Sequence, residues 1–497
     1  MIFFILLILT GLFFYYHLYY KRLPYPPGPM PVPLLGNMVE LALNEPGEDA
    51  HLKWHKRFGP IHTVWFGELP VINITDYKLM VEMFQRDGDA YSGRAYCMKE
   101  TQEFWSATRN TKAGVVCSEN ELWLKSRKFM YQTLRRFGMG KDLMQQKILA
   151  EVERLTQRID LKNDQGVAGI NLPEMFDLSI GSVIYSVILG ECFDKHNIHM
   201  FKQLKTFSNM HMNYVLHPFN LIQQKNFHLY KNLPGFRHYQ KVTLDGWSGM
   251  MNFFDDQIRE HKEFIDSIEN LDSYQATDLI YQFLKEWRQK LGDDEDLIYN
   301  DQNLKVICID SWLAGQDTVS TTLAWTVIYS VCWPECQQKL QEELDKVVGS
   351  DRLICLSDKD DLPYVNAFIN ETQRLANILA TNLIHQTTRD VNVNGFNIPK
   401  GTAIIPQISA VLHSKEIFED PKVFNPGRFL DESGQLKQIN ERQCVGESLA
   451  KAELFLMIAN LFNQYRILPH GELPSLKRKF GVTTQHLPYK VQLTKRY

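Results

Sequence analysis

The sequence predicts a mainly α-helical protein of the α+β class, with small peripheral strands and a membrane-spanning helix at its N-terminus. Three observations support this fold class. The first 20 residues are almost entirely apolar, helix-period patterns fill most of the remaining chain, and strand-like runs are few and short. No glycine-rich loop follows a strand-like run, which argues against a dinucleotide or phosphate cradle.

Length and composition are those of a globular protein with a large core. The chain has 497 residues, 44% of them hydrophobic, and a formal net charge of -4. Because 54 basic residues nearly balance 58 acidic ones, nothing indicates a nucleic-acid partner. The 8 cysteines are scattered without a CxxC pair, which favours buried thiols in a reducing compartment over a disulfide scaffold or a structural zinc site.

Residues 1–20 are the predicted transmembrane signal-anchor. The run from Ile2 to Tyr20 is apolar or aromatic apart from two residues, close to the roughly 20 residues that cross a bilayer. Tyrosines gather at its end, and Lys21 and Arg22 follow at once, which places the body on the cytosolic side. A cleaved signal peptide would need a basic n-region and a small-residue cleavage site, and neither is present.

Residues 21–37 are predicted to form a stiff, proline-rich hinge. Six prolines lie between Leu23 and Asn37, which forbids helix and favours an extended arm. A plain linker and an SH3-domain ligand are alternatives. A rigid spacer that holds the body at a fixed attitude to the membrane fits both neighbours better.

Residues 38–497 are predicted to form the catalytic body, since no repeat and no second linker interrupts them. A strand pair with its turn at Gly67 and Glu68 comes early, and most of the later chain is helical. The predicted helices are Ala50–Phe58, Tyr77–Gln85, Asn120–Gln132, Leu143–Asp160, Pro173–Leu189, Thr243–His261 and Leu304–Val331; the predicted strands are Ile61–Phe66, Leu69–Ile74, Asp390–Val393, Thr402–Pro406 and hairpin-like pieces near the C-terminus.

Two predicted helices carry residues that could do chemistry. Trp123 and Arg127 lie four apart on one helix face, where an indole N–H and a guanidinium can bind a carboxylate, or form an ordinary surface cation–π pair. In Leu304–Val331, Thr318 can donate to the Ala314 carbonyl and bend the helix, which would open a groove. Asp317 beside Thr318 could then relay protons, although a Thr-rich surface face explains the pattern equally well.

Cys444 lies just before another helix pattern, which begins at Ser448, and Gly446 between them suits a tight turn. The orphan N–H groups and the dipole at a helix start favour a thiolate, which can be a nucleophile or a metal ligand. An isolated cysteine is more often an inert buried residue. Glu371 and Arg374, an i,i+3 pair, and Arg428 in a turn are likewise ordinary when taken alone.

Taken in order, these features resemble one family. The anchor, the proline hinge, WxxxR, AGxDT, ExxR, a PxRF-like turn and RxCxG are similar to those of the microsomal cytochrome P-450s, which are haem-thiolate monooxygenases. The resemblance covers essentially the whole chain. Tyr91–Arg94 and Asn397–Thr402 resemble the animal clan that handles xenobiotics, steroids and fatty acids.

The resemblance implies the cytochrome P-450 fold and a set of site residues around haem b. Cys444 is then the axial thiolate ligand of the haem iron. The other implied residues are the proton-delivery pair Asp317 and Thr318, the oxygen groove at Ala314 and Gly315, the structural triad Glu371, Arg374 and Arg428, and the propionate ligands Trp123, Arg127, His385, Arg442 and Arg94. Implied substrate-contact regions are Tyr96–Trp105, Phe201–Phe207, Cys308–Ala314, Leu379–Leu383 and Val482–Thr484.

The resemblance also implies the reaction, the partners and the location. One atom of O2 enters a small apolar substrate, and NADPH supplies electrons through the membrane-bound NADPH–cytochrome P-450 reductase docked on the proximal side. Cytochrome b5 is a second candidate electron donor. The expected location is the endoplasmic reticulum membrane, with a single N-terminal anchor and a cytosolic body.

The segment before Cys444 departs from the family. The family loop has the form FxxGxRxC, whereas residues 436–444 lack its aromatic residue and its glycine and are several residues shorter. Because that loop aims N–H groups at the sulfur and screens it from water, the departure predicts impaired haem binding. Either a coding segment is missing from the gene model, which the intact frame from Arg442 favours, or the chain itself binds haem poorly.

Two other functions are compatible with the motifs. One is a catalytically inactive, membrane-anchored haem- or lipid-binding protein of the same fold, which the shortened loop favours. The other is a haem-thiolate isomerase or dehydratase, which needs no oxygen-activating pair. The intact pair Asp317 and Thr318 favours the monooxygenase.

Overall fold

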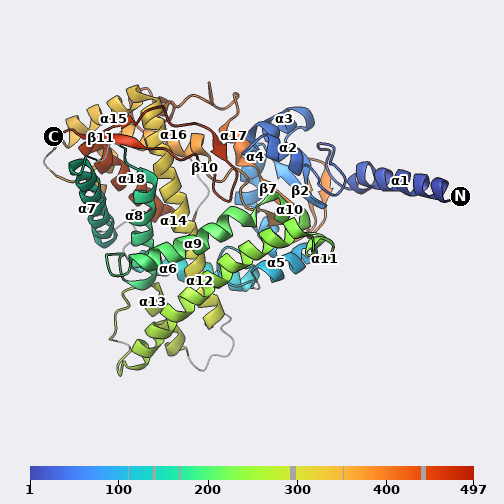
Figure 1. The fold of residues 1–497 in the computed structure, drawn as a ribbon, viewed down its shortest axis with the longest axis horizontal. Helices are drawn as coiled ribbons and strands as arrows, with labels where there is room; N and C mark the ends of the chain where they lie inside the picture. The colour runs from blue at the N-terminus through green and yellow to red at the C-terminus, as the bar shows by residue number, and fades with distance from the viewer. Residues whose placement is uncertain are drawn as a thin grey trace.

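The computed structural model describes residues 1–109, 111–137, 142–166, 169–271, 273–290, 298–350, 352–437 and 444–497. Helices make up most of this chain, and the sheets are small, as the α+β prediction requires. Figure 1 shows the helices gathered in one large body. The main sheet lies between that body and a single helix, α1, that projects away from it.

The α-helices differ widely in length, from one turn to nine. Their bounds are α1 Ile2–Leu18, α2 Met38–Leu43, α3 Glu48–Phe58, α4 Tyr77–Val81, α5 Gln102–Thr108, α6 Asn120–Arg136, α7 Asp142–Asp164, α8 Leu172–Leu189, α9 Ile198–Val215, α10 Pro218–Gln223, α11 Phe227–Tyr230, α12 Pro234–Asp266, α13 Leu279–Gln289, α14 Asp301–Cys332, α15 Pro334–Val347, α16 Pro363–Ala376, α17 Ile408–Leu412 and α18 Glu447–Gln464. Short 3-10 or π turns lie at Tyr20–Arg22, Glu82–Arg86, Gly88–Tyr91, Ala95–Cys97, Lys99–Thr101, Leu356–Asp361 and Pro426–Phe429.

The strands form one mixed sheet and three two-stranded ribbons. The main sheet has the order β1-β2-β7-β4-β3, in which β2 and β7 are parallel and Ile72 pairs with Ile404. The ribbons are β5–β6, β8–β11 and β9–β10, all antiparallel. The strands are β1 Ile61–Phe66, β2 Leu69–Ile74, β3 Gly93–Arg94, β4 His385–Gln386, β5 Val391–Val393, β6 Phe396–Ile398, β7 Ala403–Pro406, β8 Tyr465–Pro469, β9 Arg478–Lys479, β10 Gln485–His486 and β11 Val491–Lys495.

Helix α14 forms the centre of the body. It packs against α8, α12, α16 and α18, and both Trp312 and Trp325 on it are fully buried. A helix that is apolar on all sides is stable only when other elements cover it on all sides. The polar residues in the middle of α14 therefore face the protein interior or an internal space, and both positions suit a functional site.

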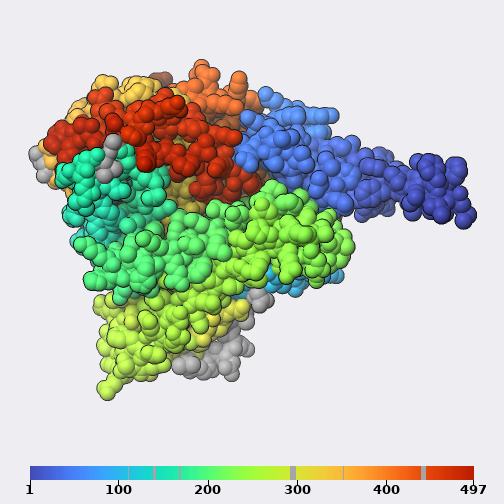
Figure 2. All heavy atoms as spheres, in the orientation of Figure 1, coloured from blue at the N-terminus to red at the C-terminus, as the bar shows by residue number. Residues whose placement is uncertain are grey.

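Two helices of the described chain are long and apolar enough to cross a membrane. Ile2–Arg22 is only 6% buried and projects from the body, whereas Leu172–Leu189 is 78% buried and is therefore a core helix. The first of these agrees with the predicted anchor. Figure 2 shows it standing clear of the rest of the surface.

The proline segment that follows the anchor is extended but not free. The Thr63 N–H of β1 donates to the Pro27 carbonyl, and the Asn37 N–H donates to the Trp65 carbonyl. A side chain at Gly28 would lie 2.0 Å from the Thr63 carbonyl oxygen, so only glycine allows this close approach. The predicted spacer is stiff because the edge of the main sheet holds it, as well as because it is rich in proline.

Several predicted elements have the predicted bounds, and others do not. The strands Ile61–Phe66 and Leu69–Ile74 are correct to the residue. The helix expected at Thr243–His261 runs from Pro234 to Asp266, since proline is tolerated in the first helical turn. The one expected at Tyr77–Gln85 ends at Val81 and continues as a wider π turn.

Candidate functional site

The centre of α14 carries the predicted acid and alcohol. The Thr318 hydroxyl donates to the Ala314 carbonyl at 2.7 Å, as expected from their spacing. The helix continues unbroken through both residues. Ala314 is exposed and Gly315 and Thr318 are half-buried within a helix whose other faces are covered, which means that this part of α14 borders open space.

Asp317 is held by side chains from two distant segments. The Thr483 hydroxyl donates to Asp317 Oδ2, and Lys205 Nζ of α9 lies 3.7 Å from Asp317 Oδ1. Lys205 also donates to Asp177 of α8 and to Gln316, each at 3.0 Å. These contacts link the half-buried Asp177, through the ammonium group of Lys205, to the acid beside Thr318.

The three residues of the predicted triad lie together. Arg374 donates two hydrogen bonds to Glu371, from Nε to Oε2 at 2.6 Å and from Nη2 to Oε1 at 2.8 Å. Arg428 Nε donates to the same Oε1 at 3.0 Å. The Glu371 and Arg374 side chains are 0% and 2% exposed. The Phe418 ring packs against both guanidinium groups. A carboxylate this deeply buried is stable because two cations share it.

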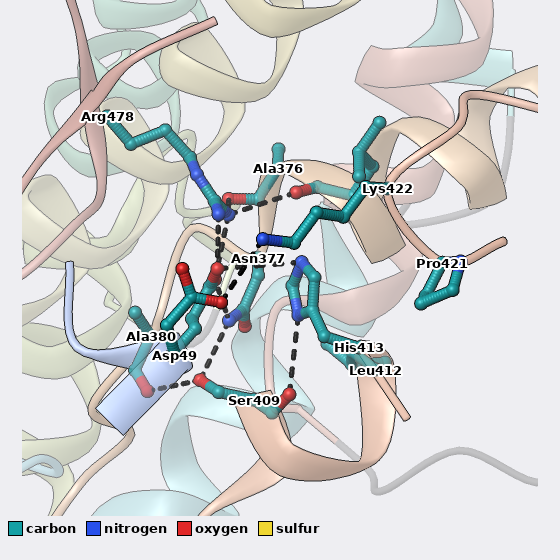
Figure 3. A network of polar contacts seen from close by, with 12 residues as sticks. Asp49, Ala376, Asn377, Ala380, Ser409, Leu412, His413, Pro421, Lys422 and Arg478 are labelled. Carbon is teal, nitrogen blue, oxygen red and sulfur yellow. Dashed lines mark hydrogen bonds and ion pairs between the residues drawn. The ribbon is translucent and has the colours of Figure 1, made fainter. Parts of the chain in front are cut away.

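A second polar network continues from the triad. Arg374 Nη1 donates to the Leu412 and Pro421 carbonyls, at either side of the segment that joins α17 to Arg428. Asn377, the residue after α16, donates to Glu48 and to Ser409, and Arg478 pairs with the same glutamate. Figure 3 shows Asn377, Ser409 of α17 and Arg478 of β9 converging in this network. Together the two networks fix the segment behind the C-terminal end of α16.

Cys444 is exposed and lies two residues before Gly446, the N-cap of α18. The Glu447 N–H, the first of the helix, donates to the Cys444 carbonyl at 3.4 Å. The expected turn into the helix is therefore present, but Gly446 has a φ of -92°, which any residue adopts, so the turn does not require glycine. Residues 438–443, which include the predicted site residue Arg442 and the departure from the family loop, lie outside the described residues.

The remaining predicted ligands form two separate pairs. Arg94 of β3 and His385 of β4 are both buried, and Arg94 Nη1 lies 2.9 Å from Nδ1 of the imidazole, a contact that the neighbouring strands impose. Arg127 stacks over the Trp123 ring at 5.7 Å on α6. Both members of this second pair are half-buried, so part of each side chain remains accessible to a ligand.

This set of groups fits haem. The exposed thiol at the start of α18 suits an iron ligand, and the indole and the cationic side chains suit the two carboxylates of a porphyrin. The open face of α14 at Ala314 belongs to a helix that packs directly against α18. No other metal site competes within the described chain, which contains no cluster of three or more histidine, cysteine or acidic residues.

Sequence reasoning placed Lys205, Asp310 and Thr483 within expected substrate-contact regions but missed the polar contacts that they make around α14. Lys205 and Thr483 hold Asp317 and come from segments far away in the sequence, so no local pattern marks them. Asp310 pairs with Arg109 in the interior, both side chains being about 5% exposed. A usable signal existed here, because a lone aspartate within the apolar run Val306–Leu313 needs a buried partner.

Comparison with known proteins gives the family. A family model described as Cytochrome P-450 matches residues 26–493. Cytochrome P-450 2C3 of Oryctolagus cuniculus is 32% identical over 454 residues, 89% of this chain and 88% of the relative. Cytochrome P-450 2C4 of the same organism is 31% identical over 457 residues, with the same coverage. Cytochrome P-450 2J3 of Rattus norvegicus is 30% identical over 484 residues, 94% of this chain and 90% of the relative.

These matches cover the anchor-proximal segment, the sheet, the helical body and the C-terminal ribbons. The chain therefore belongs to the cytochrome P-450 family and resembles its animal microsomal members, as the sequence predicts.

Proposed function

We propose that this chain is a membrane-anchored haem-thiolate monooxygenase that acts on a small apolar substrate. Family membership implies haem, with electrons from NADPH delivered through a reductase. The observation that carries the proposal is the set of polar contacts that runs from Asp177 through Lys205 to Asp317, the residue before Thr318 on α14. The balanced reaction is RH + O2 + NADPH + H+ giving ROH + H2O + NADP+.

Bound haem supplies the iron at which dioxygen is activated, with electron density donated by a thiolate. In the proposed arrangement Cys444 provides that thiolate from the start of α18. Trp123, Arg127, Arg94 and His385 hold the propionates through N–H donors, and Arg442 would join them. The Glu371, Arg374 and Arg428 cluster keeps the segment behind the haem in place.

The polar residues of α14 handle protons. The Thr318 hydroxyl lies where the helix borders open space. Asp317, the residue before it, can receive protons from the surface by way of Asp177 and Lys205. Ala314 has a small side chain on the same helix face as Thr318, so a small molecule can approach the hydroxyl. Gly315 instead faces Ile184 of α8, which would lie 2.6 Å from a side chain at that position. A carboxylate beside an alcohol can accept a proton and pass it on to the hydroxyl group.

The expected partners follow from the family. The reductase would dock on the proximal side, and cytochrome b5 is a second candidate donor. The exposed apolar helix α1 and the microsomal relatives agree with an anchor in the endoplasmic reticulum membrane, and we propose that the body lies in the cytosol. A fatty acid, a steroid or a xenobiotic is the proposed substrate class, since the expected contact region Tyr96–Trp105 is rich in aromatic residues.

The decisive measurement is a carbon-monoxide difference spectrum of the reduced, full-length protein. A Soret band at the long wavelength that a thiolate ligand produces is expected, and the Cys444→Ser variant should lose it. A protein that folds but retains no haem contradicts the monooxygenase and favours the inactive haem- or lipid-binding alternative. Sequencing of the transcript between the codons for Lys437 and Cys444 then decides whether a coding segment is missing.

Thr318→Ala distinguishes oxygen activation from the isomerase or dehydratase alternative. Product formed per NADPH should fall by about tenfold or more, because the hydroxyl that guides protons is gone, while NADPH consumption continues. Thr326→Ala is the matched control, since Thr326 makes the same hydroxyl-to-carbonyl bond two turns along α14. Unchanged turnover in Thr318→Ala would favour the isomerase or dehydratase.

A further inference from the structure

A groove lies where the membrane anchor joins the body. It has a volume of about 540 Å3 and is lined by side chains from the end of α1, the start of the proline segment, strand β1 and the turn that follows it, and the connection between α10 and α11. Figure 2 shows these last residues, in green, against the blue base of the anchor. The lining residues are Tyr16, Tyr20, Lys21, Leu23, Pro24, Tyr25, Trp65, Glu68 and Lys225.

Polar contacts hold the residues at the base of the groove in place. Lys21 Nζ donates to both oxygens of Glu68 at 3.0 Å and lies 4.5 Å from the centre of the Trp65 ring. Arg22 donates to the Gly28 carbonyl at 2.9 Å. The base of the anchor is therefore bound to the body by polar contacts, and the groove keeps its shape without a ligand.

The groove carries one uncompensated positive charge. Its charged lining residues are Lys21, Lys225 and Glu68, and the Lys21 ammonium already takes both oxygens of the single carboxylate. Lys225 is half-buried and makes no hydrogen bond or ion pair with any described residue. Its ammonium is close enough to Lys21 to repel that group, so an anion between the two would relieve the repulsion.

With α1 spanning the bilayer, the groove lies at the level of the lipid headgroups. Helix α1 has 17 residues and is about 26 Å long, close to the hydrocarbon thickness of about 30 Å. Tyr16 and Tyr20 at its end are 49% and 57% exposed, as expected of rings at the membrane interface. The groove thus opens at the level at which phosphate groups of lipids lie, with acyl chains free to run alongside α1.

We infer that this groove binds the headgroup of an anionic phospholipid, with its phosphate on Lys225 and its glycerol region against Tyr16, Tyr20 and Leu23. The Trp65 face is already occupied by the Lys21 ammonium, so the quaternary ammonium of a choline headgroup finds no aromatic cage there. A bound lipid bridges the anchor and the α10–α11 connection. It thereby fixes the attitude of the body on the membrane.

The test counts lipids bound to the full-length protein in an uncharged detergent by native mass spectrometry. Added dioleoyl phosphatidylserine should give one tightly retained lipid, and dioleoyl phosphatidylcholine should bind at least tenfold more weakly. Lys225→Gln should weaken phosphatidylserine retention by about tenfold, because a charge-assisted contact to phosphate is lost. Lys231→Gln is the matched control, since Lys231 is exposed six residues further on and does not line the groove.

Three outcomes would overturn the assignment. Equal weakening in Lys225→Gln and Lys231→Gln would mean that only the diffuse charge of the surface attracts the lipid. Equal retention of phosphatidylcholine and phosphatidylserine would remove the requirement for an anionic headgroup. Displacement of the lipid by an equal concentration of inorganic phosphate would make the groove a site for free phosphate. The lipid count is independent of turnover and of haem content, so it is also independent of the proposed enzymatic function.

Discussion

Arg109 and Asp310 form an ion pair in the interior of the body, with Arg109 Nη2 2.7 Å from Asp310 Oδ1. The other carboxylate oxygen accepts the N–H groups of Val115 and Val116 at 2.8 and 2.9 Å. The guanidinium lies 4.1 Å from the Trp247 ring centre. One aspartate of α14 thus holds the whole segment between α5 and α6, at the edge of an expected substrate-contact region.

Asp310→Asn should destabilise the protein by about 3–5 kcal/mol, because it leaves the Arg109 charge buried without its counter-charge. Urea unfolding followed by circular dichroism measures the loss. The double variant Arg109→Leu with Asp310→Asn should recover part of it, since the uncompensated cation is then gone. Glu40→Gln, which breaks an exposed pair with Lys53, is the control and should cost under about 1 kcal/mol. A single-variant cost as small as that of the control would mean that the pair contributes nothing to the fold.

Glu371→Gln should be at least as damaging as Asp310→Asn. The variant leaves the charges of Arg374 and Arg428 without their shared carboxylate in an interior site, a loss of about 3–5 kcal/mol or more. The expected result is a low yield of folded protein and an earlier urea midpoint. Asp256→Asn breaks the exposed i,i+3 pair with Arg259 and should change stability by less than about 0.5 kcal/mol. A normal urea midpoint in Glu371→Gln would show that the cluster is dispensable.

Acid should destabilise the fold through three buried histidines. Burial lowers the pKa of His51 to about 3 and those of His62 and His211 to about 4. In the unfolded chain each has a pKa of about 6.5. The unfolded state therefore binds more protons below that value, so stability is complete above pH 6.5 and is lost as the pH falls toward 4. Each histidine should contribute a loss of about 2 kcal/mol between pH 6.5 and pH 5.

His51→Phe tests this dependence. The Nδ1 atom of His51 has no hydrogen-bond partner among the described residues, and its ring packs edge-on against Trp54, so a phenyl ring should be tolerated. Urea unfolding at pH 7.5 and pH 5 should show a smaller difference in this variant than in the parent chain. The exposed His196→Gln should leave the difference unaltered. An equal pH difference in parent and His51→Phe would exclude His51 as a source of acid sensitivity.

Thr483→Val should lower the yield of product per NADPH several-fold, because the Asp317 carboxylate loses the hydroxyl that orients it. The substrate-induced shift of the Soret band should change little, since valine keeps the shape of threonine. Thr484→Val is a matched control: the neighbouring hydroxyl donates to the Asn377 carbonyl and does not touch Asp317. Equal coupling in both variants would argue against an orienting role for Thr483.

Local pattern was enough to predict most of the fold. The strand pair β1–β2 follows from alternation around Gly67, which has a φ of 58° in the turn. The bond from Thr318 to Ala314 follows from helical spacing alone. The contact between Glu371 and Arg374 likewise needs only a helix, whereas the approach of Arg428 to the same carboxylate needs the chain to return after more than 50 residues. Local sequence pattern does not show that Arg428 and Glu371 meet in space.

The sequence by itself determined the family and the helical class, and it predicted the anchor and the residue types of the site. These depend on composition, on period and on the order of short motifs, all of which are local. Only the tertiary structure decided which groups hold Asp317, that Asp310 is paired with Arg109, and that Lys225 comes to the base of the anchor. Each of these contacts joins segments far apart in the chain. Packing of the helices around α14 brings together the first two sets, and the placement of the α10–α11 connection beside β1 brings Lys225 to the anchor.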